Sequence, residues 1–221
     1  MPVQLDYWFH SLRLIAVAYL LGSIPTGYLL IRIFRKQDIR TLGSGNIGAT
    51  NVLRSGAKGL GATTFLLDVL KGAAAVLLCE KLATVGFPIA QLHAAALAAF
   101  CAVLGHIFPI WLNLKGGKGV ATAFGVFAVL APYAALLSLA VFILLFAVFR
   151  YVSLASILGA ASFPLWARLT TRASHDWVIF AIEILIPLFV IAKHRQNISR
   201  LLAGTEYRFG KPKIPPTDNL A

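Results

Sequence analysis

Charged residues are scarce in this chain of 221 residues, and acidic ones are the scarcest. Only 13% of the residues are charged, against about 25% in a typical soluble domain, whereas 59% are hydrophobic and the mean hydropathy is +0.81. So few charges could not cover the surface of a water-soluble fold of this size. The composition therefore excludes a soluble enzyme and a disordered chain, and it predicts an integral membrane protein.

Cysteine is almost absent as well. The two residues, Cys79 and Cys101, both lie inside apolar runs. This usage excludes a secreted disulfide scaffold, which needs many cysteines in a short chain. We expect both thiols to be buried as small hydrophobic groups, without a redox or metal role.

The few charges that are present are mostly positive. Twenty Lys and Arg residues face eight Asp and Glu residues, which gives a net charge of +12. In a membrane protein such an excess indicates positive-inside topology, contact with anionic lipids or binding of anionic solutes. Nucleic acid is not an expected partner, because the chain has no soluble basic domain to hold it.

Six apolar tracts approach the roughly 20 residues that a membrane-spanning helix needs. They are 11–34, 59–80, 87–112, 119–149, 152–167 and 177–193. The fourth has 31 residues, which as one helix would extend about 46 Å, too long for one crossing and short for two. Pro132 lies in its middle, where a turn is plausible.

Charge counting decides between one span and two in this tract. With two spans, fifteen Lys and Arg residues lie on the cytoplasmic side and four outside, whereas one span gives ten against nine. Only the first distribution obeys the positive-inside rule. We therefore predict an all-α polytopic membrane protein with seven helices, two of them short, an external N-terminus and a cytoplasmic C-terminus. Residues 1–206 form one membrane domain, and 207–221 are expected to be an exposed tail because they are rich in proline.

Three polar segments fall on the cytoplasmic side in this topology, and the first is 42–54. Its glycines match G-x-G-x-x-G, but the dinucleotide fingerprint also needs a preceding strand, and here an apolar helix precedes. Converging backbone N–H groups, polar side chains and an arginine could still bind an anion. The contributing residues are Gly43, Ser44, Gly45, Asn46, Thr50, Asn51 and Arg54. A flexible interfacial loop with a snorkelling arginine is an equally good interpretation.

The second segment contains Gly116, Gly117, Lys118 and Gly119. It resembles the end of a P-loop but lacks the required Ser or Thr and the preceding strand. A glycine-rich backbone with an ammonium group at the start of a helix is a suitable phosphate site. The alternative is a positively charged anchor at a tight turn, although three glycines in four positions exceed what an anchor needs.

The third segment is 194–206. In a helix, His194 and Asn197 share a face and would direct an imidazole and an amide at one target. Glu206 follows a glycine, and we expect it to pair structurally rather than to act in catalysis.

Two ionisable residues lie within a predicted span. Asp68 and Lys71 are three positions apart and are expected to pair with one another. Such residues are costly in a membrane and indicate function by default. Their depth suits structural support of the polar segments from below.

Taken together, these segments resemble the bacterial acyl-phosphate:glycerol-3-phosphate acyltransferases, the PlsY family of integral membrane enzymes. The segments that carry the resemblance are 22–25, 43–54, 68–72, 105–122 and 194–206. They occur in order along nearly the whole chain, and as a set they are specific. The outer loop 168–176 and the tail 207–221 carry no resemblance.

The resemblance implies transfer of a fatty acyl group from acyl-phosphate to the 1-hydroxyl of sn-glycerol 3-phosphate, giving lysophosphatidic acid and phosphate. It implies no acyl-CoA, no acyl carrier protein, no metal and no cofactor. It also implies a bacterial cytoplasmic membrane location with the site on the cytoplasmic face. The chain has neither the His-x4-Asp of other glycerolipid acyltransferases nor a G-x-S-x-G nucleophile motif.

The same resemblance implies a catalytic set of Ser44, Arg54, Lys118, His194 and Asn197, with the glycines at 116, 117 and 119 in the glycerol 3-phosphate loop. Our hypothesis is that Arg54 and Lys118 neutralise phosphate, while Ser44 and Asn197 orient the donor and stabilise the oxyanion. His194, with an ordinary pKa near 6.5, is either the general base or a positioning group, in which case the departing phosphate takes the proton.

A membrane carrier of phosphate-containing anions is the alternative from another class. Such carriers commonly show repeated halves and a site at the membrane midplane. We find no internal repeat, which favours the enzyme. Membrane lipids are expected partners, and the pathway suggests a peripheral enzyme that makes acyl-phosphate, although no residue identifies it.

Overall fold

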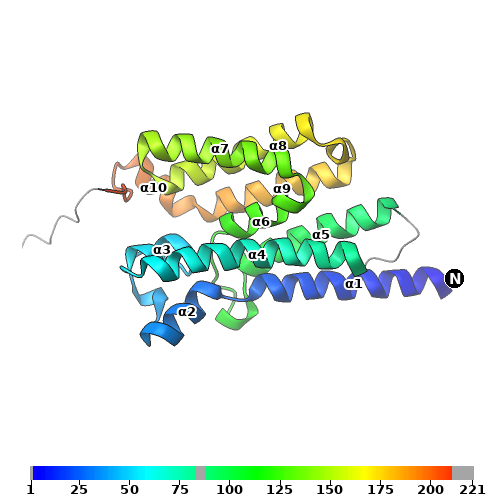
Figure 1. The fold of residues 1–221 in the computed structure, drawn as a ribbon, viewed down its shortest axis with the longest axis horizontal. Coiled ribbons are helices and arrows are strands. Elements are labelled where there is room, and N and C mark those ends of the chain that lie inside the picture. The colour runs from blue at the N-terminus through cyan, green and yellow to red at the C-terminus, as the bar shows by residue number, and fades with distance from the viewer. Residues whose placement is uncertain (1, 83–87, 211–221) are drawn as a thin grey trace, which may run out of the picture.

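A computed structural model describes residues 2–82 and 88–210, and the regular structure in this part of the chain is helical throughout (Figure 1). Its α-helices are α1 (Pro2–Ser23), α2 (Thr26–Arg35), α3 (Ala49–Arg54), α4 (Lys58–Leu82), α5 (Pro88–Ile107), α6 (Val120–Leu130), α7 (Pro132–Phe149), α8 (Val152–Thr170), α9 (Trp177–Lys193) and α10 (Arg195–Leu202). Short 3-10 turns lie at Ile39–Thr41, Ile110–Leu112 and Arg172–His175.

The long helices form two groups that lie side by side. Helices α1, α4 and α5 pack on one another, and α8 packs on both α7 and α9. Helix α6 lies between the groups in contact with α4, α5 and α7 (Figure 1). Helix α5 also contacts α9, which joins the groups directly.

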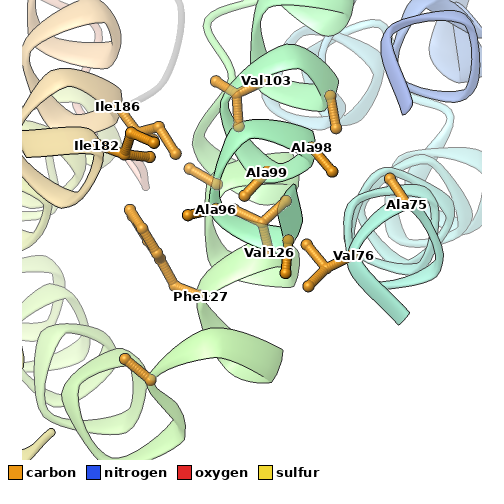
Figure 2. Packing of buried hydrophobic residues seen from close by; sticks show 14 of the residues in the cluster. Ala75, Val76, Ala96, Ala98, Ala99, Val103, Val126, Phe127, Ile182 and Ile186 are labelled. Carbon is orange, nitrogen blue, oxygen red and sulfur yellow. The ribbon is translucent and has the colours of Figure 1, made fainter. Parts of the chain in front are cut away.

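Small residues form much of the core between these helices. Ala96 and Ala99 of α5 are at most 1% exposed, and they face a core that α4, α6 and α9 complete (Figure 2). Phe127 extends from α6 toward Ile182 and Ile186 of α9. Alanine lets helix backbones approach closely, which is the usual basis of helix packing in membranes.

The first apolar tract is broken next to Pro25. Helix α1 ends at Ser23, and α2 begins after Pro25, which has no N–H to donate. The Ile24 carbonyl accepts a hydrogen bond from Lys71 Nζ at 2.8 Å, so a side chain of α4 stabilises the break.

The tract 119–149 is divided as predicted. The backbone leaves helical geometry at Ala131, and Pro132 is the first residue of α7. Helix α6 has 11 residues, so it extends about 16 Å, roughly half of a bilayer core.

Five helices of the described residues are long and apolar enough to cross a membrane, or six if α9 and α10 count as one span bent by 57°. The chain is therefore a multi-pass helical protein, whereas the count of seven crossings and the sidedness stay predictions. Helices α2, α3 and α10 lie at the end of the bundle opposite the start of α1 (Figure 1).

The expected exposed tail differs from the structure at its beginning. Tyr207 and Phe209 are half-buried, and the Phe209 N–H donates to the Arg150 carbonyl at 2.9 Å. Aromatic side chains at these positions pack on the fold instead of extending into solvent. The remainder of the tail, 211–221, lies outside the described residues.

Candidate active site

Two adjoining cavities open at the end of the bundle where the three polar segments meet. The outer cavity has a volume of about 1180 Å³ and the inner one about 160 Å³. Both are lined by the same five polar residues, Ser44, Asn46, Arg54, Lys118 and Asn197. The segments that the sequence identified separately therefore form one site.

The other predicted site residues line the outer cavity, the inner cavity or neither of the two. Gly43 and Gly116 line the outer cavity, whereas Thr50, Asn51, Asp68, Gly119, His194 and Glu206 line the inner one. Gly45, Lys71 and Gly117 line neither of these two cavities.

Asn51 organises the first segment rather than offering its amide to a ligand. It is 2% exposed, and its Nδ2 donates to the carbonyls of Leu42 at 2.9 Å and Asn46 at 2.8 Å. Its Oδ1 accepts from the Ser44 N–H at 2.8 Å, and a Cβ on Gly43 (φ +56°) would collide with this amide. Our expectation that Asn51 is a free donor was wrong, because the fold of its own loop consumes the amide.

Gly45 is also explained by the loop. Its φ is +70°, and its N–H donates to the Leu42 carbonyl at 2.9 Å, which closes a turn. Besides Arg54, the groups left for a ligand are the hydroxyls of Ser44 and Thr50 and the Nδ2 of Asn46, which make no hydrogen bond with the described residues. The Oδ1 of Asn46 accepts from the Gly48 N–H at 2.9 Å.

The first two glycines of the second segment serve close packing, because their N–H groups are used on the end of α5. The N–H of Gly116 donates to the Ile107 carbonyl at 3.2 Å, and that of Gly117 to the His106 carbonyl at 3.1 Å. A Cβ on Gly117 would strike the His106 imidazole. The expected phosphate loop therefore uses its first two glycines to lie against the end of α5, and Gly119 (φ +84°) then starts α6.

Lys118 extends from this loop into the cavities. Its Nζ donates to Asn197 Oδ1 at 2.6 Å, and Asn197 Nδ2 donates to Glu206 Oε1 at 2.7 Å. Burial lowers the pKa of Lys118 to about 8, although the Glu206 carboxylate partly opposes the shift. Near neutral pH the lysine is therefore a cation that has lost part of its hydration and is ready to bind an anion.

Glu206 connects α10 with α8. Besides Asn197, it accepts from Ser153 Oγ at 2.8 Å and Arg200 Nε at 2.7 Å. Burial alone would raise the pKa of Glu206, but the hydrogen bonds from Asn197, Arg200 and Ser153 outweigh it and hold that pKa below its ordinary value. The carboxylate thus acts as the structural partner that the sequence predicted.

His194 lies in the bend between α9 and α10 and is 2% exposed. Its Nδ1 donates to the Val190 carbonyl at 2.8 Å, which leaves Nε2 with its lone pair. Burial and then the charge of Lys118 lower the pKa of His194 to about 4. The imidazole is accordingly neutral at physiological pH and a weaker base than its ordinary pKa indicates.

Arg54 is held differently from the other cations. Its guanidinium carbon lies over the Tyr207 ring, 4.1 Å from the ring centroid, and the side chain forms no hydrogen bond with the described residues. Burial lowers the pKa of Arg54, yet arginine stays charged throughout the physiological range.

A buried polar network supports the site from below. Asp68 and Lys71 form the predicted ion pair at 2.7 Å, and Lys71 Nζ also lies 3.0 Å from His106 Nδ1. Thr26 Oγ1 donates to Asp68 Oδ1 at 2.7 Å. The network therefore joins α2, α4 and α5 beneath the glycine segment that rests on His106.

Two serines and a tyrosine are among the lining residues that sequence analysis missed. Ser153 and Ser156 of α8 line the inner cavity, and Tyr207 lines the outer one. A signal for the serines was available, because two hydroxyls three positions apart begin an otherwise apolar tract. Tyr207 gave no such signal.

The outer cavity is strongly positive. Six cationic residues line it, and no carboxylate of the described residues does: Arg35, Arg54, Lys118, Lys193, Arg195 and Arg200. Such a cavity concentrates anions.

An apolar cavity of about 120 Å³ continues from the inner one between α6, α7, α8 and α9. The two share four lining residues, Phe65, Val120, Phe142 and Ser156. Phe127 and Phe163, stacked with ring centroids 3.6 Å apart, also line it. The site thus combines an anion-binding space with a space suited to a hydrocarbon chain.

Comparisons with known proteins are consistent along most of the chain. A family model described as glycerol-3-phosphate acyltransferase matches residues 12–204. A glycerol-3-phosphate acyltransferase of Syntrophotalea carbinolica is 50% identical over 89% of this chain and 96% of its own length. Another, from Trichlorobacter lovleyi, is 51% identical over 88% and 95%.

Two solved structures have a similar fold. The glycerol 3-phosphate form of PlsY, an integral membrane glycerol 3-phosphate acyltransferase, is 40% identical and superposes with a TM-score of 0.82 over 90% of this chain and 96% of its own. The lysophosphatidic acid form is 39% identical, with a TM-score of 0.79 over 90% and 95%.

Proposed function

The chain belongs to the glycerol-3-phosphate acyltransferase family, and from that premise we propose that it transfers a fatty acyl group from acyl-phosphate to the 1-hydroxyl of sn-glycerol 3-phosphate. The products are lysophosphatidic acid and inorganic phosphate, which makes this the first acylation of phospholipid synthesis. The observation that carries the proposal is the junction of a cationic cavity with an apolar one.

This junction fits a donor with a phosphate head and an acyl tail. The tail would lie in the apolar cavity between α6, α7, α8 and α9, with the mixed anhydride in the inner cavity beside Lys118. Glycerol 3-phosphate would enter from the outer cavity, whose cations suit its phosphate dianion. The bound forms of the PlsY relatives support glycerol 3-phosphate as acceptor and lysophosphatidic acid as product.

Direct transfer is sufficient for this chemistry. The 1-hydroxyl oxygen attacks the acyl carbon, a new ester C–O bond forms, and the bond to the phosphate oxygen breaks. Phosphate is a good leaving group, so no covalent enzyme intermediate is required. Arg54 and Lys118 stabilise the phosphate charges, and Ser44 donates its hydroxyl to the reacting groups.

The roles of Asn197 and His194 follow from their contacts. Asn197 holds the Lys118 ammonium through Oδ1, which makes it a positioning group with one remaining N–H for the oxyanion. His194 accepts the substrate hydroxyl at Nε2 and orients it. Because its pKa is near 4, we assign the proton to the departing phosphate, whose dianion is the stronger base.

We further propose that the chain crosses the bacterial cytoplasmic membrane seven times, with the site at the cytoplasmic face. Helix α6 would be a short span that leads away from the cytoplasmic side. Helix α7 would lead back to the cytoplasmic side, where the site lies. The positive residues around the outer cavity support this orientation through the positive-inside rule.

The test uses purified protein in lipid, given palmitoyl-phosphate and glycerol 3-phosphate, with phosphate release recorded beside a palmitoyl-CoA control. We expect release only with both substrates, and loss of release in Arg54→Ala. If neither donor gives phosphate release, and the same protein transports a phosphate ester into liposomes, the protein is instead an anion carrier.

A further inference from the structure

Arg54 lacks the polar partners that usually hold a buried arginine in place. It lines both the outer and the inner cavity, yet none of its five N–H donors bonds to a described residue. The Nε atom is buried without a partner. A flexible side chain in this situation needs another constraint to present a fixed geometry to a ligand.

Tyr207 supplies that constraint through its ring. The guanidinium carbon of Arg54 lies 4.1 Å from the ring centroid, which is a close cation–π contact. Stacking occupies the flat face of the guanidinium and leaves its N–H edges free. A carboxylate partner would occupy the same edges that a phosphate needs, whereas an aromatic ring does not compete.

The ring is itself fixed from behind by Phe209. The two rings meet edge to face with centroids 5.3 Å apart, and Phe209 packs in the same way on Phe146 of α7 at 5.7 Å. The Phe209 N–H donates to the Arg150 carbonyl at 2.9 Å, at the end of α7. This arrangement attaches the segment after α10 to a different part of the bundle from α3, which carries Arg54.

We propose that Tyr207 is a positioning residue for the phosphate clamp: its ring, supported by Phe209, holds the Arg54 guanidinium with both terminal nitrogens directed at the acceptor phosphate. The segment 206–209 is therefore part of the site and not of a tail. Glu206 orders Asn197 and Lys118 on one side of the cavity, and Tyr207 orders Arg54 on the other. The inference rests on the proposed function for its substrate.

The experiment compares Tyr207→Phe with Tyr207→Leu, in steady-state acyl transfer and in direct calorimetric binding of glycerol 3-phosphate to the purified protein in lipid. Tyr207→Phe retains the ring, so its KM should lie within about two-fold of the unmodified chain. Tyr207→Leu should raise KM and Kd for glycerol 3-phosphate roughly ten-fold and change kcat less than about three-fold.

Two further variants separate positioning from general stability. Phe209 lines neither of the two cavities. We expect Phe209→Leu to raise KM for glycerol 3-phosphate by a smaller factor than Tyr207→Leu does. If Tyr207→Leu does not fold, Phe209→Leu provides the test in its place. In an Arg54→Ala background, Tyr207→Leu should have almost no further effect on Kd for glycerol 3-phosphate, because the guanidinium that the ring holds is gone.

The matched control is Arg208→Ala. Arg208 is next in sequence and exposed, and its guanidinium lies 5.9 Å from the Tyr151 ring, away from Arg54. Its KM should be unchanged.

Three results would overturn the inference: unchanged affinity in Tyr207→Leu, equal losses in Tyr207→Phe and Tyr207→Leu, or a full Tyr207→Leu effect on Kd in the Arg54→Ala background. Calorimetry also separates this inference from the proposed function. Glycerol 3-phosphate binding that depends on Tyr207, in a protein without acyl transfer, would sustain the clamp and refute the reaction.

Discussion

Single residues of this site are specialised by how their polar atoms are already used. Asn51 uses its amide on its own loop, and Asn197 uses most of its amide on Lys118 and Glu206. Lys118 and the Nε2 of His194 retain capacity for a ligand. Residue type alone therefore does not distinguish a ligand-binding amide from a structural one, but the hydrogen-bond partners do.

Lys118 predicts a pH dependence of acceptor binding. Its pKa of about 8 means that it is protonated below pH 8 and neutral above it, so affinity for glycerol 3-phosphate should fall as pH rises through 8, approaching about ten-fold per unit. Bound dianion raises the pKa, so binding should take up protons there. Calorimetry in two buffers with different ionisation heats measures this uptake.

The control for the pH dependence is Lys118→Arg. Arginine stays charged across this range, so the decline should flatten. An equally steep decline in that variant would assign the titration to another group.

His194→Gln tests whether the imidazole takes the proton. Glutamine retains a polar group at this position but is not a base, so we expect kcat within about ten-fold of the unmodified enzyme if His194 only orients the hydroxyl. Removing a general base costs about 100- to 10,000-fold, and a loss of that size would contradict the assignment. His175→Gln, an exposed histidine in the turn before α9, is the matched control.

At the scale of elements, two of the helices that line the apolar cavity, α6 and α8, run away from the polar site. Val120 of α6 and Ser156 of α8 lie at the junction of the apolar cavity with the inner cavity. Phe127 and Phe163 are each seven residues farther along, about 10 Å deeper. We therefore expect their stacked rings to form the floor of the cavity and, in the proposed reaction, to limit the length of the acyl chain.

Phe127→Leu should move the donor preference toward longer chains. A smaller side chain deepens the apolar cavity. Each additional methylene of the acyl chain buried there contributes about 0.8 kcal/mol, or roughly four-fold in affinity. The measurement is kcat/KM for a series of acyl-phosphates of increasing length. Phe100→Leu, whose ring packs on Phe189 in a different part of the core, should leave the preference unchanged, and an unshifted optimum in Phe127→Leu would refute the floor.

At the scale of the whole molecule, the two helix groups bring the polar segments to one end. Helices α4 and α8 run away from the site, and α5 and α9 return to it. The chain therefore comes back repeatedly to the end of the bundle that carries the site. Helix α6 starts at the site and ends inside the bundle. This course agrees with the predicted alternation of crossings, although length alone identifies five or six spans.

Labelling from each side of the membrane tests the orientation. In a chain with Cys79 and Cys101 replaced by alanine, Lys58→Cys at the site end should react with an impermeant maleimide only from the cytoplasmic side. Arg172→Cys, in the exposed turn between α8 and α9, should react only from the outside. The reverse pattern would invert the topology, and labelling of both from one side would refute the crossing number.

The sequence by itself determined the membrane class, the break at Pro132, the three polar segments and the Asp68–Lys71 pair. These features are local: composition, a missing N–H and the spacing of charges on one helix act within a few residues. Only the tertiary structure decided that the N–H groups of Gly116 and Gly117 pair with α5, that Ser153 faces Glu206, and that Tyr207 holds Arg54. Each of these depends on segments distant in sequence meeting in space, because a polar atom bonds to whichever partner the packed helices bring within reach.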